Sequence, residues 1–208
     1  GWGGIPQIFD EDNDAWTQRR EALKGLLSPE EYKSARASTL NAHYTSPLVV
    51  RSIYRAIEGM GFRSGNILEP ACGTGNFFGA IPENLRASTL YGVELDSLTG
   101  RIAQKLYPDA HISIQGFEHA SLPDGYFDVA VGNVPFGAYS LADAHYDRFH
   151  FRIHDYFFAK ALDKVRPGGL IAFVTSKGTM DKQDASVRRY IAQRAELLGA
   201  IRLPNTAF

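Results

Sequence analysis

Short apolar runs and helically spaced apolar residues alternate along most of this chain. A continuous apolar run is typical of a strand buried on both faces of a parallel sheet, whereas apolar residues three and four positions apart indicate a helix. From residue 46 onward the two patterns succeed each other repeatedly, which predicts an α/β fold with a doubly wound, mostly parallel sheet. The expected strands are 66–69, 90–95, 112–115, 127–132, 170–175 and 197–203, and the expected helices are 47–58, 98–106, 156–165 and 185–194.

The beginning of the chain follows another pattern. Apolar residues have helical spacing over 16–27 and 28–36, and Ser28–Glu31 reads as a helix start, with a hydroxyl cap, a proline and two carboxylates. We therefore expect a helical N-terminal arm over residues 1–40, packed on a catalytic domain over residues 41–208 whose sheet is truncated at its carboxyl end.

Composition narrows the class of protein. The 208 residues carry 22 Lys and Arg against 23 Asp and Glu, so bulk charge gives no sign of a nucleic-acid partner. One cysteine, Cys72, excludes a disulfide framework and a cysteine-built zinc site. We find no apolar run of about 18 residues, no secretory signal and no metal-ligand spacing, and expect a cytoplasmic protein without metal or membrane contact.

A glycine-rich turn follows the first expected strand, where doubly wound folds bind ligands. Gly73 and Gly75 leave room for a ligand to approach the backbone. Phe78 stands where a dinucleotide fingerprint needs a third glycine, and no phosphate-binding loop is present, which disfavours NAD and ATP. Glu94 ends the next strand, where a carboxylate binds ribose hydroxyls, and Glu69 suits a cation. The combination predicts a nucleoside with a charged tail, such as S-adenosylmethionine.

A second turn, at the end of the expected strand 127–132, suits methylation of a planar amine. The Asn133 side-chain oxygen and the Val134 carbonyl can accept the two amine hydrogens, which localises the nitrogen lone pair. Pro135 stiffens the turn, and Phe136 can stack on a base.

These motifs resemble those of the N6-adenine DNA methyltransferases. Asn133–Phe136 matches the family's Asn-Pro-Pro-aromatic signature, Leu68–Phe77 its cofactor turn, and His43–Pro47 its amino-terminal cofactor segment, in the order of the gamma class. The layout also resembles the methylase region of large helicase–methylase proteins of mobile elements and phages. The resemblance implies transfer of a methyl group from S-adenosylmethionine to adenine N6 in DNA, with part of the DNA contact supplied by other domains of a larger protein. It implies cofactor binding by Tyr44, Thr45, Glu69, Ala71, Gly73, Gly75, Asn76, Glu94, Leu95 and Phe117, and catalysis by Asn133, Val134, Pro135 and Phe136.

Two departures from the family pattern keep other hypotheses open. Val134 replaces the first proline of the signature, and Gly116 replaces an acid that holds the cofactor adenine, so Glu118 or a water would substitute. These departures make possible a degenerate domain that binds DNA or partners without catalysis. A further alternative is methylation of RNA or of a protein glutamine, because the same kind of turn serves any conjugated amide or amine.

The segment 137–153 is rich in aromatic and basic residues, and it reads equally as a nucleic-acid clamp and as an ordinary surface loop. We expect Cys72 to be a small packing residue, and His43 and His154 to be core or hydrogen-bonding residues. Four cations, Lys177, Lys182, Arg188 and Arg189, either add positive field or lie on solvated helix faces.

Overall fold

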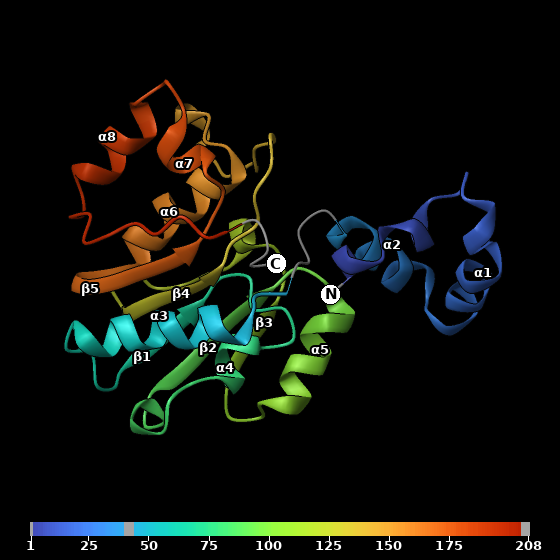
Figure 1. Cartoon of the computed structure of the whole chain (residues 1–208), viewed down its shortest axis with the longest axis horizontal. Coiled ribbons are helices and arrows are strands. Elements are labelled where there is room, and N and C mark those ends of the chain that lie inside the picture. Colours follow the sequence, from blue (N-terminus) through green and yellow to red (C-terminus); the bar gives the residue numbers. More distant parts are fainter. Residues whose placement is uncertain (1, 40–43, 205–208) are drawn as a thin grey trace.

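The computed structural model describes residues 2–39 and 44–204, and its centre is a five-stranded parallel sheet in the order β3-β2-β1-β4-β5 (Figure 1). Helices separate successive strands, because parallel neighbours need a crossover connection. The α/β class predicted from the sequence is confirmed. The strands are β1 (Asn66–Glu69), β2 (Thr89–Glu94), β3 (His111–Ile114), β4 (Phe127–Asn133) and β5 (Val165–Val174).

Helices lie at the N-terminus and between the strands. The α-helices are α1 (Thr17–Leu26), α2 (Pro29–Ser38), α3 (Pro47–Gly59), α4 (Asn76–Gly79), α5 (Ser97–Leu106), α6 (Ile153–Lys164), α7 (Gly178–Asp181) and α8 (Ser186–Ala192). Short 3-10 helices cover Trp2–Gly4, Pro6–Phe9, Asp14–Trp16, Glu83–Leu85, Phe117–His119 and Asp147–Phe149.

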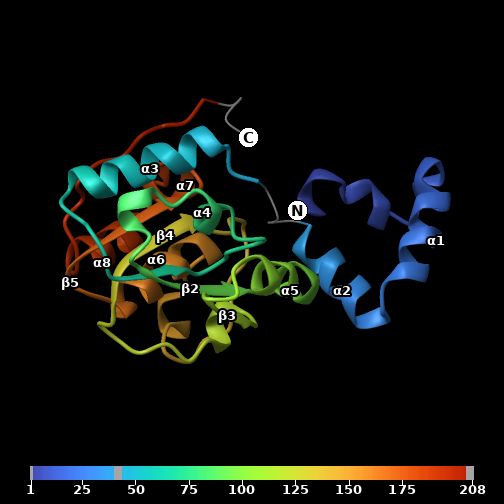
Figure 2. The same cartoon turned by 90° about the horizontal axis from the view of Figure 1, so that it is seen from below.

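Alternating side chains of the central strands build a core on each face of the sheet. In β1, Ile67 packs with Tyr54 of α3, whereas Leu68 packs with Tyr156 of α6, and all four are fully buried. This alternation follows from the two-residue period of a strand. Figure 2 shows the sheet between α3 and α6.

Strand register brings three polar residues to the same edge of the sheet. Glu69 is opposite Gly92, two positions before Glu94 at the end of β2, and Asn133 ends β4 opposite Val174. The carboxyl ends of parallel strands meet at one edge, so residues distant in sequence share a site there.

The N-terminal helices begin where the sequence predicts. Ser28 Oγ accepts a hydrogen bond from Glu31 N (3.2 Å), and the Glu31 carboxylate accepts one from Ser28 N (2.9 Å), which forms a capping box at the start of α2. Residues of this part share a small apolar cluster of their own, with Ile8, Phe9 and Ala35 buried at its centre.

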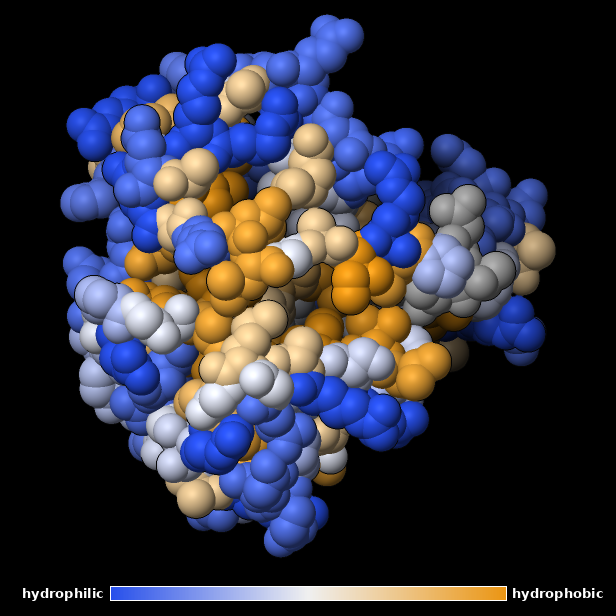
Figure 3. Space-filling model, turned by 60° about the vertical axis from the view of Figure 1, so that its left-hand side comes forward, coloured by the Kyte–Doolittle hydropathy of each residue, from blue (hydrophilic) through white to orange (hydrophobic). Residues whose placement is uncertain are grey.

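The strand predicted at 197–203 is wrong. Residues 195–204 have no regular secondary structure, and Leu197, Leu198 and Ile201 are 67%, 58% and 89% exposed. Alternating or continuous apolar residues form a strand only where a neighbouring strand supplies hydrogen bonds, and this segment does not pair with β5, the edge strand of the sheet. Figure 3 turns the β5 side of the molecule forward and shows hydrophobic residues exposed on it.

Leucine-to-alanine changes at two positions test this assignment of core and surface. Leu68→Ala in β1 removes a fully buried side chain and should lower the free energy of unfolding by about 2–5 kcal/mol. Leu106→Ala in α5, at a side chain 59% exposed, should change it by less than about 0.5 kcal/mol. Chemical denaturation measures both values, and equal losses would contradict the burial pattern.

Candidate functional site

Glu69 is a buried carboxylate at the end of β1. The residue is 2% exposed, and its Oε2 has no hydrogen-bond partner among the described residues. Burial, followed by the charge of Glu94, raises the pKa of Glu69 well above its usual range. A buried acceptor without a partner is uncommon, because leaving it unpaired costs roughly 1–3 kcal/mol. The site therefore offers an acceptor ready for a donor group, above all a cationic one.

Glu94, at the end of β2, joins two turns of the site. One oxygen accepts a hydrogen bond from Gly73 N (2.8 Å), and the other accepts one from Asp96 N (2.8 Å). Burial raises the pKa of Glu94, and these backbone N–H groups offset part of that rise. Each oxygen keeps a second lone pair for a ligand hydroxyl. The sequence did not single out Asp96, although an Asp before a helical pattern is a common cap signal.

The two glycines of the cofactor turn have different surroundings. Both have positive φ, +56° at Gly73 and +85° at Gly75. A Cβ on Gly73 would meet no atom within 4 Å, whereas a Cβ on Gly75 would overlap the ring of Tyr107. The sequence-based reason for Gly75 therefore needs correction: this glycine makes room for Tyr107, and Gly73 borders the open space.

The second predicted turn follows β4 directly beside Glu69. A Cβ on Gly132 would lie 3.3 Å from Glu69 Cγ, so the Glu69 side chain lies alongside the residue that precedes Asn133. The Asn133 amide oxygen is buried and has no partner among the described residues. Val134 is buried and its N–H donates to Val174 O (3.1 Å), whereas the Phe136 ring is 37% exposed. An unpaired amide oxygen and a surface aromatic ring thus flank Pro135.

The other predicted cofactor residues surround the same edge, with different exposure. Thr45 is buried and Tyr44 is 58% exposed, just before the first residue of α3. Leu95, which follows Glu94, is 59% exposed, an unusual position for a leucine. Ala71 is half-buried and Asn76 is exposed at the start of α4, while the Phe117 ring lies in the core, 4.9 Å from that of Phe157.

Gly116 is covered by a nearby carboxylate. A Cβ on Gly116 would overlap the carboxylate of Glu118, whose side chain folds back over the glycine. Glu118 therefore occupies the space that a side chain at position 116 would take. That Glu118, or a water, substitutes for an acid at position 116 stays a prediction.

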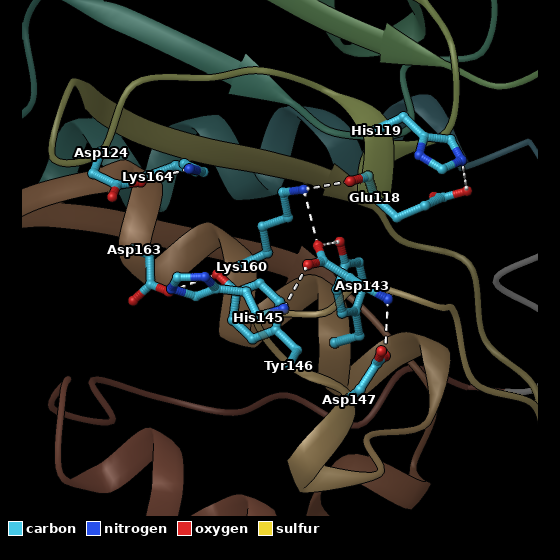
Figure 4. A network of polar contacts seen from close by, with 11 residues as sticks. Glu118, His119, Asp124, Asp143, His145, Tyr146, Asp147, Lys160, Asp163 and Lys164 are labelled. Atoms are coloured by element: carbon cyan, nitrogen blue, oxygen red, sulfur yellow. Dashed lines mark hydrogen bonds and ion pairs between the residues drawn. The ribbon is translucent and has the colours of Figure 1, made fainter.

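The loop between the Asn133 turn and α6 is anchored by α6 (Figure 4). Asp143 accepts hydrogen bonds from Tyr156 Oη (2.7 Å) and Lys160 Nζ (3.3 Å), and Lys160 also donates to the Glu118 carbonyl (3.1 Å). Tyr146 Oη donates to Asp163 (2.5 Å). Burial would raise the pKa of Asp143, but the hydrogen bonds from Tyr156 and Lys160 and the Lys160 charge hold that pKa below its usual value. The network ties the segment after β3 to the loop after β4.

Most aromatic residues of this loop face inward. Tyr146 and Phe151 are each 6% exposed, and Phe149 and Phe151 both pack against Tyr190 of α8, with ring centroids 4.9 and 5.0 Å away. The interpretation of these three residues as a stacking clamp is therefore wrong, because α6 and α8 supply them with apolar partners.

Several other predicted side chains are used within the protein. Cys72 is buried against Gly92, and burial raises the pKa of its thiol, as expected for a packing residue. His154 is buried, and His43 lies outside the described residues. Lys182 pairs with buried Asp155, and Arg188 donates to the Lys182 carbonyl, whereas Lys177 and Arg189 are exposed.

Within residues 2–39 and 44–204, no three His, Cys, Asp or Glu side chains are grouped to hold a metal ion. Over the same part of the chain, every helix is too short or too polar to cross a membrane.

Two acids at neighbouring strand ends, with an open glycine turn between them, place this chain among the S-adenosylmethionine-dependent methyltransferases. The fold agrees with that class. A protein from Listeria monocytogenes assigned as a class I S-adenosylmethionine-dependent methyltransferase superposes with a TM-score of 0.69 at 20% identity, covering 100% of this chain and 74% of that one. Within the class, the chain belongs to the N-6 DNA methylase family, whose pattern matches residues 26–208.

Known relatives are similar over parts of their length. Defense against restriction protein B of Escherichia phage P1 is 31% identical over 197 residues, 92% of this chain and 8% of that protein. Modification methylase CviBIII of Paramecium bursaria Chlorella virus NC1A is 35% identical over 71 residues, 34% of this chain and 19% of the methylase. The rRNA N(6)-adenosine-methyltransferase metl-5 of Caenorhabditis elegans is 26% identical over 172 residues, 78% of this chain and 76% of that enzyme. The chain thus spans less than a fifth of the first two.

Alanine at each glycine of the cofactor turn should separate their roles. Gly75→Ala forces a Cβ into the Tyr107 ring at positive φ and should lower the free energy of unfolding by about 2 kcal/mol or more. Gly73→Ala should cost about 1 kcal/mol of stability but weaken binding of S-adenosylhomocysteine at least about tenfold, because its methyl enters the open space. Thermal unfolding and calorimetry measure the two effects. Unchanged binding by the Gly73 variant would show that no ligand approaches there.

Proposed function

We propose that this chain transfers a methyl group from S-adenosylmethionine to the N6 amino group of adenine in DNA. The observation that carries the proposal is a pair of buried oxygens without partners among the described residues: the Asn133 amide oxygen at the end of β4 and Glu69 Oε2 at the end of the neighbouring strand β1. Two acceptors at the ends of neighbouring strands fit two donors that arrive together, one on the cofactor and one on the substrate.

The residues at the ends of β1 and β2 fit the cofactor. Glu69 would accept the ammonium group, and Glu94 would accept ribose hydroxyls through its remaining lone pairs. Gly73 leaves the space for the ligand to lie against the backbone, and Leu95 offers an apolar contact for the adenine. S-adenosylmethionine, when bound, supplies a methyl group on a positively charged sulfur. We assign further cofactor contacts to Tyr44, Thr45, Ala71, Asn76 and Phe117, with Glu118 in place of an acid at 116.

The turn after β4 would orient the amine. Asn133 Oδ1 accepts one amine hydrogen and the Val134 carbonyl the other, which withdraws the nitrogen lone pair from the ring and directs it at the methyl group. Val134 supplies the same backbone acceptor as a proline. Phe136, exposed at the end of the turn, would stack on a flipped base. A methylated amine is acidic enough to lose its proton to water, so the turn needs no strong base.

DNA is the substrate we favour because of the family and because the similar viral protein is a modification methylase. The second candidate is RNA, which the similarity to an rRNA adenosine methyltransferase favours. The two substrates present the same amine to Asn133, so the turn alone does not separate them.

Transfer of a labelled methyl group to DNA, RNA and protein in parallel tests the proposal. We expect label in DNA, recovered as N6-methyladenine after digestion and mass spectrometry. Label in RNA or in protein glutamine, with DNA unlabelled, would contradict the DNA assignment. Binding of S-adenosylmethionine with no transfer to any of the three would identify a non-catalytic domain.

Asn133→Ala should reduce kcat on DNA by at least about a hundredfold, because it removes an acceptor that acts on the reacting amine. The dissociation constant for S-adenosylhomocysteine should change by less than about twofold. Asn84→Ala, at an exposed asparagine, is the matched control and should retain full activity. Turnover preserved in the Asn133 variant would remove this residue from the reaction.

Glu69 should couple cofactor binding to proton release. The carboxyl is protonated more readily than a free one because burial raises its pKa, and a bound ammonium would lower that pKa again. Affinity should therefore rise with pH up to the pKa of Glu69 in the free protein and level off above it. Calorimetry in buffers of different ionisation enthalpy counts the protons. Glu69→Gln should abolish the release, and an unchanged proton count in that variant would assign the effect elsewhere.

A further inference from the structure

The N-terminal helices dock on the main domain through polar contacts that all reach the first two turns of α5. Trp2 Nε1 donates to Asp96 Oδ2 (3.3 Å), Ser97 N donates to Ser34 Oγ (3.3 Å), and Arg101 pairs with Glu31. Figures 1 and 2 both show α2 beside the start of α5, at the edge of the sheet where the strands end.

These helices have an apolar cluster of their own, separate from the two cores of the main domain. Trp2 packs edge-on to Phe9 (5.7 Å) within that cluster, and α2 lies over α5. A small polar interface of this kind is typical of segments that dock reversibly. A change that orders the residues at the start of α5 would therefore also stabilise the contacts of the N-terminal helices with α5.

Asp96 connects this interface to the cofactor site. Its side chain caps α5 by accepting from Thr99 N (3.1 Å), and the same Oδ2 receives the Trp2 indole. Its backbone N–H donates to Glu94 Oε1 (2.8 Å), the carboxylate assigned to the ribose. Trp2 therefore contacts the residue that orients Glu94. Asp96 Oδ1 is buried without a partner among residues 2–39 and 44–204, which adds to the cost of leaving this turn unsupported.

We propose that Trp2 is a positioning residue for the cofactor: docking of the N-terminal helices on the Glu94–Ser97 turn and binding of S-adenosylmethionine stabilise each other. Trp2 holds Asp96, and Asp96 holds Glu94 in the orientation that receives the ribose. Linkage requires the effect to be reciprocal, so the bound cofactor also tightens docking. This inference rests on the cofactor assignment within the proposed function and is independent of whether DNA or RNA is methylated.

The chain's two tryptophans, Trp2 and Trp16, provide a matched pair of variants. Both belong to the N-terminal cluster, but the indole of Trp2 reaches α5, whereas Trp16 packs with Arg19. Trp2→Phe keeps a ring in the cluster and removes the donor to Asp96. Calorimetry with S-adenosylhomocysteine should give a dissociation constant about five- to twentyfold weaker for Trp2→Phe and within about twofold of wild type for Trp16→Phe. For catalysis, Trp2→Phe should raise KM for S-adenosylmethionine and leave kcat within about twofold.

Fluorescence gives a second readout that does not depend on activity. In the Trp16→Phe protein, Trp2 is the sole tryptophan, and its emission should change on addition of S-adenosylhomocysteine with the midpoint that calorimetry gives. In the Trp2→Phe protein, emission of Trp16 should not change. If the Trp2 variant binds as tightly as wild type, or Trp2 emission does not respond, the inference is wrong while the proposed function stands. If wild type itself fails to bind S-adenosylhomocysteine, the proposed function fails first.

Discussion

The site depends on two buried oxygen atoms, Glu69 Oε2 and Asn133 Oδ1, that no described residue satisfies. Parallel strands place them at one edge, because β1 and β4 are neighbours and both end there. Each unpaired acceptor costs roughly 1–3 kcal/mol of stability, which only a bound donor returns. The surrounding core holds this unfavourable arrangement rigidly, since α3 and α6 pack on opposite faces of the same two strands. A ligand that pairs these acceptors therefore removes their cost, and this gain in stability contributes to the free energy of binding.

Glu94, at the end of the neighbouring strand β2, differs from Glu69 because both of its oxygens already have hydrogen-bond donors. Its two oxygens already hold backbone N–H groups, from Gly73 on one side and Asp96 on the other. The carboxylate is thereby fixed before any ligand arrives, and it links the two turns that border the site. Fixing an orienting group in advance lowers the entropy lost on binding. Glu69 thus favours a ligand that brings a hydrogen-bond donor, whereas Glu94 offers acceptors whose orientation is already fixed.

The sequence was most informative where chemistry is local. The polar strand ends, the glycine turn and the Asn133 turn follow from residues within a few positions of one another, and the structure brings them to one edge. It was less informative where a partner comes from elsewhere in the chain. Gly75 accommodates Tyr107, Tyr146 and Phe151 find apolar partners on α6 and α8, and the 197–203 segment lacks the strand it would pair with. Composition states that a residue is aromatic or apolar, but not which surface it faces.

The same argument applies to charge. Residues 137–194 carry ten Lys and Arg against six Asp and Glu, a local excess hidden in the chain's net charge of −1. Several of these cations neutralise carboxylates inside the domain: Lys160 holds Asp143, Arg166 holds Asp128 and Lys182 holds Asp155. Cations already paired with carboxylates release few counterions on meeting phosphate, so they add little to affinity for a nucleic acid. Under the proposed function, recognition at this edge would therefore draw more on the turn that carries Asn133 and Phe136 than on these paired cations.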